Sequence, residues 1–187
     1  MSFEEKYMAR GKNTAVVRLL YSSMFLALAM LLPFLIGQIR PFGIALLPMH
    51  IPVILCGFIC GPSWGMAVGI AAPLLRSIVF GQPTMISAIA MAFELATYAF
   101  IAGILYKSLK KNLFMFYIEL LTAMVAGRIV WGLVMFVLIF LGLASGSIGF
   151  GLIWGGTVLN SIPGIILQLI VIPPIINVLK KNRLMLN

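Results

Sequence analysis

Residues 19–36 read LLYSSMFLALAMLLPFLI, a run of 18 positions without a charged side chain. A helix of about 20 apolar residues is long enough to cross the hydrocarbon core of a bilayer. Similar runs recur along the chain, in which 63% of the 187 residues are hydrophobic and 9% are charged. The runs are continuously apolar and do not alternate, which excludes a transmembrane barrel. The sequence therefore predicts an all-α integral membrane protein.

Turn residues and charges divide the chain into six apolar segments, expected at about residues 17–36, 48–60, 63–80, 85–106, 113–143 and 157–179. Gly61-Pro62 separates the second segment from the third, since proline favours the first position of a helix. One long helix over residues 51–75 is the alternative. We predict a compact bundle of six transmembrane helices over residues 17–179. A polar N-terminus, 1–16, precedes the bundle, and a basic tail, 180–187, follows it.

Basic residues gather at three segment ends, and their distribution decides the topology. The clusters are Lys6, Arg10, Lys12 and Arg18; Lys107, Lys110 and Lys111; and Lys180, Lys181 and Arg183. With six helices all three lie on one side, as the positive-inside rule requires, whereas five helices would place the first opposite the others. We therefore predict that both termini are cytoplasmic and that residues 37–47, 81–84 and 144–156 are external. Ten of the 13 basic residues that give the net charge of +9 lie in these clusters. No basic stripe with interleaved aromatics indicates a nucleic-acid partner.

The few ionisable residues inside apolar segments indicate a polar site. An ionisable group in hydrocarbon is costly unless it faces a cavity or a partner. Counted at about 1.5 Å per residue, one polar residue from each of the last five segments falls in the outer half of the bundle. These are His50 at the outer face, Arg76, Glu94, Arg128 and Asn160. The pattern predicts an externally open binding pocket.

Each of these residues also has a purely structural interpretation. His50 and Arg76 would extend toward the interface, Glu94 and Arg128 would pair with each other, and Asn160 would bond between helices. Glu119 is expected to be interfacial. Cys56 and Cys60 share a helix face, but two thiols without further ligands make a weak metal site. We interpret the two thiols as packing and predict no metal.

Small residues recur at four-residue spacing in two places. Gly57, Gly61, Gly65 and Gly69 are expected to let neighbouring helices of this chain approach closely. Ser23 and Ala27 form a similar pair on the first segment, which has no strongly polar face. A smooth stripe there favours contact with another membrane subunit.

From about residue 20 to residue 179 the chain resembles the substrate-binding S components of energy-coupling factor (ECF) vitamin transporters. The resemblance rests on the order and spacing of LPMHIPV at 47–53, CGP at 60–62 with Trp64-Gly65, APLLRS at 72–77, AMAFELATY at 90–98 and IPGIILQ at 162–168. It implies a six-helix protein that captures a vitamin outside the cell, with a pocket formed by the outer halves of the later helices and the loop after the first. Pocket residues differ widely within the family and do not transfer between vitamins.

The resemblance also implies partners and a mechanism. Family members contact a transmembrane coupling subunit through an Ala-xxx-Ala motif on the first helix. Ser23 and Ala27 occupy these positions here, with serine in place of the first alanine. Two partner ATPase subunits supply energy, and the loaded S component topples in the membrane to release its ligand inside. The expected setting is the plasma membrane of a prokaryote, with lipid around the bundle.

Motif absences limit the activities of the chain itself. It has no phosphate-binding loop, so we predict no ATP hydrolysis and no cofactor of its own. An intramembrane hydrolase would need a nucleophile, a base and an orienting group, and His50 has no evident partner serine. The remaining alternative is a stand-alone secondary transporter of a small polar solute, with protons carried by Glu94 and Arg128. Inverted repeats would support that alternative, and we recognise none.

The ligand is inferred from charge. Two arginines outnumber the one deep acid, which favours an anion. Pantothenate, with one carboxylate, one amide and two hydroxyls, suits Arg76, Arg128 and Asn160. A pyridoxine-like ring is the second candidate; Glu94 or His50 would bind it, and Tyr98 or Trp154 would stack on it.

Overall fold

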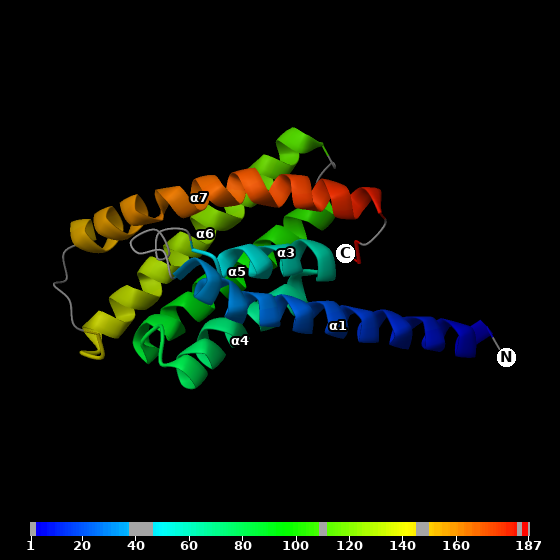
Figure 1. The fold of residues 1–187 in the computed structure, drawn as a ribbon, viewed down its shortest axis with the longest axis horizontal. Helices are drawn as coiled ribbons and strands as arrows, with labels where there is room; N and C mark the ends of the chain where they lie inside the picture. The colour runs from blue at the N-terminus through cyan, green and yellow to red at the C-terminus, as the bar shows by residue number, and fades with distance from the viewer. Residues whose placement is uncertain (1–2, 38–46, 109–111, 145–149, 183–184, 187) are drawn as a thin grey trace.

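The computed structural model describes residues 3–37, 47–108, 112–144, 150–182 and 185–186, with the backbone alone at 3–13, 36–37 and 150–160. Regular structure within these ranges is entirely helical (Figure 1). The helices are α1 (Phe3–Gly37), α3 (His50–Cys60), α4 (Pro62–Phe80), α5 (Met85–Ser108), α6 (Leu113–Phe140) and α7 (Phe150–Lys181). The predicted all-α class is confirmed.

Residues 51–75 form two helices rather than one. Gly61 separates α3 from α4 with φ 100°, and Pro62 begins α4. Within the described ranges, five helices are long and apolar enough to cross a membrane. The sixth, α3, has 11 residues and a length of about 16 Å, which is shorter than the hydrocarbon core of about 30 Å. Six complete spans and the cytoplasmic placement of the termini stay predictions.

Two helices begin earlier than the sequence predicted. Helix α1 begins at Phe3, within the segment expected to be a polar terminus, although its membrane-compatible part is Thr14–Leu35. Helix α7 begins at Phe150, within the predicted loop 144–156. Hydropathy marks the apolar part of a helix, whereas backbone hydrogen bonding can continue beyond it. Both helices therefore extend past the apolar segments predicted for them.

Helix α5 forms the centre of the bundle. Of its membrane window, 56% is buried, compared with 28% for α6 and 17% for α1. Glycines permit this close packing: a Cβ on Gly65 would lie 2.6 Å from Gly57 Cα, and one on Gly69 would lie 2.7 Å from Ala96 N. Real side chains do not tolerate such distances. The prediction that these glycines pack helices of the same chain is confirmed.

Helix α1 packs on α3 and α4 and leaves its other face open. Phe25 and Ala29 are buried, whereas Ser23 and Ala27 are exposed. The Ser23 hydroxyl donates to the Leu19 carbonyl at 2.9 Å, within its own helix. The exposed stripe therefore presents small side chains whose polar groups are already bonded.

The end of the chain returns to the bundle beside α1 and α3 (Figure 1). Leu186 N donates to the Ile59 carbonyl at 3.0 Å, and Arg18 Nη2 donates to the Leu186 carbonyl at 2.6 Å. These bonds tie residues 185–186 to Arg18 of α1, a member of the first basic cluster, and to the C-terminal end of α3.

Candidate functional site

Glu94 of α5 is the centre of a buried polar cluster. Its Oε1 accepts a hydrogen bond from the Tyr98 hydroxyl at 2.9 Å and lies 3.1 Å from Nη1 of Arg128 on α6. His50 Nε2, at the start of α3, lies 3.7 Å from the same oxygen. Three helices thus bring four of the predicted site residues together.

The cluster lies deep in the bundle. His50 and Glu94 are each 1% exposed, and the Arg128 side chain is 11% exposed. The His50 side chain is therefore packed inside the bundle and does not extend toward the interface, while its expected place on the outer side of the membrane stays a prediction. The expected deep pairing of Glu94 with Arg128 is confirmed.

Gly127 makes room for the tyrosine of the cluster. A Cβ at this position would collide with the ring of Tyr98. The ring therefore lies directly against the α6 backbone, one residue before Arg128. This contact sets the position from which the Tyr98 hydroxyl reaches Glu94. The His50 ring lies 5.5 Å from the Tyr98 ring, between centroids.

The hydrogen bonding of the cluster is incomplete. Among the described residues, no hydrogen-bond partner is found for the buried Nδ1 and Nε2 of His50 or for Nε and Nη2 of Arg128. Buried polar groups are usually satisfied, and leaving one unpaired costs about 1–3 kcal/mol. Such groups therefore call for a functional explanation.

Gln168 of α7 is a further candidate that sequence reasoning did not assign to the site. It is fully buried, and neither atom of its amide has a hydrogen-bond partner in the described part of the chain. It lies 13 residues before Lys181, while Glu94 lies 14 before Ser108 and Arg128 lies 15 after Leu113. At 1.5 Å per residue, all three are roughly 20 Å from the basic helix ends. Gln168 therefore shares the depth of the cluster.

The spacing along α7 contains the pattern that identifies this residue. The inward face carries Ser161, Gly164, Gln168, Ile172 and Ile176, all buried and three or four residues apart. A glutamine on the same face as two core isoleucines is a polar group directed into the bundle.

Arg76 lies apart from the cluster. Its Nη1 donates to the Met30 carbonyl of α1 at 2.8 Å, and its guanidinium lies 4.6 Å from the ring centroid of Phe34. In this arrangement Arg76 joins α4 to α1. The side chain of Asn160 lies outside the described residues. Substrate contacts by both residues stay predictions.

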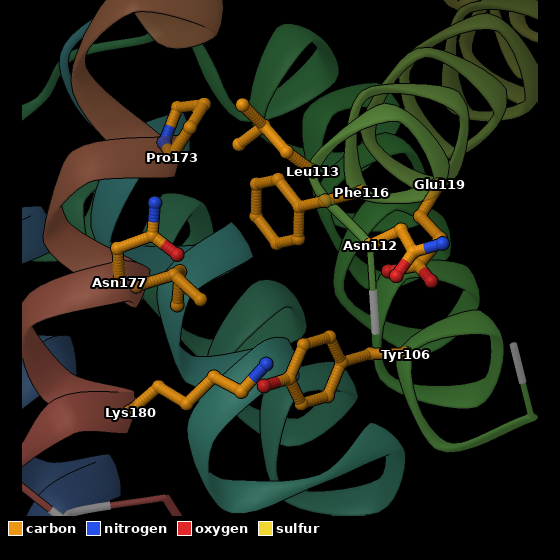
Figure 2. Close-up of a pocket in the computed structure, with 9 residues that line it drawn as sticks. Tyr106, Asn112, Leu113, Phe116, Glu119, Pro173, Asn177 and Lys180 are labelled. Carbon is orange, nitrogen blue, oxygen red and sulfur yellow. The ribbon is translucent and has the colours of Figure 1, made fainter. Parts of the chain in front are cut away.

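A second polar pocket, of about 30 Å³, lies between α5, α6 and α7 at the basic helix ends (Figure 2). It is lined by Tyr106, Asn112, Leu113, Phe116, Glu119, Pro173, Ile176, Asn177 and Lys180. Glu119 is 2% exposed, and its expected place at the membrane interface stays a prediction. None of the predicted substrate-binding residues lines this pocket, and its small volume is nearer to that of a water than of a vitamin.

The cysteines fit the packing interpretation. Both thiols are buried and reduced, and Cys56 Sγ lies 3.6 Å from the Ser22 hydroxyl as a hydrogen-bond donor. Among the described residues, no group of three potential ligands surrounds a metal position.

Residues 17–176 match a family model described as "ECF transporter, substrate-specific component". The chain belongs to this family. The S component is a multi-pass membrane subunit that binds a small-molecule substrate and associates with a membrane coupling subunit and ATPases. Comparisons with curated proteins and with solved structures returned no match.

Proposed function

We propose that this S component captures a water-soluble vitamin at the outer side of a prokaryotic plasma membrane. Pantothenate is the first candidate, and a pyridoxine-like vitamin is the second. The polar cluster around Glu94 is the substrate site, to which the predicted contributions of Arg76 and Asn160 would be added from α4 and α7.

The incomplete hydrogen bonding of the cluster is the observation that carries this proposal. An ion pair that served packing alone would be stabilised by satisfying its remaining donors and acceptors, because half-satisfied networks are costly at low dielectric. Here His50 and Arg128 retain buried atoms with no partner among the described residues. A bound substrate with several oxygens would satisfy them.

Transport itself requires the partner subunits. In this proposal the chain uses no cofactor of its own, and two ATPase subunits hydrolyse ATP. The coupling subunit docks on the α1 face that contains Ser23 and Ala27, both of which are exposed. In a bilayer there is little hydrophobic drive between helices, so close packing of small residues provides the contact.

Two measurements test this function. Mass spectrometry of small molecules that co-purify with the protein should identify a vitamin. Uptake of that vitamin, labelled, should require co-expressed coupling and ATPase subunits and should stop when an ATPase subunit carries a phosphate-loop mutation. Uptake by this chain alone, with no ATPase present, would instead indicate a stand-alone secondary transporter.

A further inference from the structure

We propose that the substrate carries a carboxylate, which binds side-on to the Nε–Nη2 edge of Arg128, and that Glu94 is a positioning residue that does not contact it. This inference rests on the proposed function and narrows it to a class of vitamin. It follows from which nitrogen atoms of the Arg128 guanidinium pair with Glu94 and which do not.

Among the described residues, Arg128 is bonded through one corner of its guanidinium. Nη1 lies 3.1 Å from Glu94 Oε1, whereas Nε and Nη2 are buried without a hydrogen-bond partner among the described residues. Nε and Nη2 lie on one edge of the planar group and direct two parallel N–H bonds outward. That edge matches the two oxygens of a carboxylate, which is why arginine binds carboxylates in a bidentate manner.

Glu94 is already engaged by its own neighbours. Its Oε1 accepts a hydrogen bond from the Tyr98 hydroxyl and lies 3.1 Å from Arg128 Nη1. A substrate with a cationic group or a basic ring nitrogen would compete with Arg128 for this carboxylate. It would thereby leave a buried guanidinium without a counter-charge, which is strongly unfavourable. A carboxylate substrate instead leaves the pair in place, and the pair holds the free edge of Arg128 in position.

The first test is a titration panel on the purified full-length protein. Three carboxylate vitamins, pantothenate, nicotinate and biotin, are each compared with a neutral counterpart, namely panthenol, nicotinamide and biotinamide. Pyridoxine and thiamine represent vitamins without a carboxylate. We expect a member of the carboxylate group to bind, and its neutral counterpart to bind at least about 100-fold more weakly, because two charge-assisted bonds are lost.

The panel separates this inference from the proposed function. Binding of pyridoxine or thiamine alone, or equal binding of an acid and its neutral counterpart, would overturn the carboxylate inference and leave the vitamin-binding function intact. If no member bound, both named candidates of the proposed function, pantothenate and a pyridoxine-like vitamin, would be overturned.

The second test replaces the planar guanidinium of Arg128 by an ammonium group, which keeps the positive charge. Arg128→Lys should weaken binding of the acid at least tenfold, about one decade in Kd, and should reduce the discrimination between the acid and its neutral counterpart. A circular dichroism spectrum like that of wild type would show that the variant is folded. Arg18→Lys is the matched control, since Arg18 bonds the C-terminal tail at Leu186, and it should retain full discrimination. Full discrimination by Arg128→Lys would contradict the side-on mode.

Discussion

Arg128 Nη1 and Glu94 Oε1 lie 3.1 Å apart inside the helical bundle, and Glu94 Oε1 also accepts from Tyr98. The pair neutralises two charges where either alone would be costly. It also ties α5 to α6 at the depth where His50 begins α3. The pair therefore has a structural role, and the binding role that we propose for it can be measured separately.

The structural role predicts strong coupling between the two charges. Glu94→Gln and Arg128→Gln should each lower the free energy of unfolding by about 3 kcal/mol, because each leaves an uncompensated buried charge. The double variant Glu94→Gln/Arg128→Gln should be at least about 1 kcal/mol more stable than the sum of the single losses predicts. Reversible unfolding in mixed detergent measures all four proteins. Additive losses would mean that the two side chains do not stabilise each other.

The burial of Gln168 predicts that its replacement has opposite effects on the stability of the protein and on substrate binding. Gln168→Leu removes a fully buried amide that has no partner among the described residues. The unliganded protein should therefore be as stable as wild type or up to about 1 kcal/mol more stable. Substrate affinity should fall about tenfold or more if the amide bonds the substrate. Ile172→Leu, one turn further along the same face, is the control and should leave affinity unchanged. A destabilised Gln168→Leu protein with full affinity would assign Gln168 to packing.

The exposed stripe on α1 predicts a variant that binds but does not transport. Ala27→Trp should retain substrate affinity, because Ala27 is exposed and lies outside the polar cluster. It should abolish ATP-dependent uptake, because a large ring would hold the coupling subunit away from a close-packed surface. Ligand titration of the isolated protein and uptake by the assembled transporter are both needed. Leu35→Trp, on an exposed part of the same helix that is already bulky, is the matched control. Normal uptake by Ala27→Trp would exclude this docking face.

The basic clusters predict which side of the membrane each helix end faces, and cysteine labelling in intact cells can measure this. In a Cys56→Ala/Cys60→Ala background, a cysteine at Leu143 should react with an impermeant reagent, since Leu143 is exposed at the end of α6. A cysteine at Lys107, exposed at the end of α5, should react only after the membrane is permeabilised. Labelling at position 107 in intact cells would refute cytoplasmic termini on a six-helix chain.

The sequence predicts the helices and the central ion pair because both have large energetic consequences. Long apolar runs reveal α1 and α4 to α7, and the cost of a charge in hydrocarbon makes Glu94 and Arg128 conspicuous. The depth of His50 depends on where α3 begins relative to its neighbours, which hydropathy does not record. Arg76 is separated from the cluster by its contact with Met30 of α1, a tertiary contact that spacing along α4 cannot reveal. Gln168 is neutral within an aliphatic run, so hydropathy does not mark it, although its three- and four-residue spacing from the buried positions of α7 could have.

Removal of the Arg128 side chain tests the central claim, that the buried polar cluster binds the substrate. Calorimetric titration of the co-purified vitamin into ligand-free wild type and into Arg128→Ala compares the two affinities directly. We predict that Arg128→Ala binds at least tenfold more weakly, a loss of about 1.4 kcal/mol or more. Equal affinities in the two proteins would place the substrate site elsewhere and contradict the account.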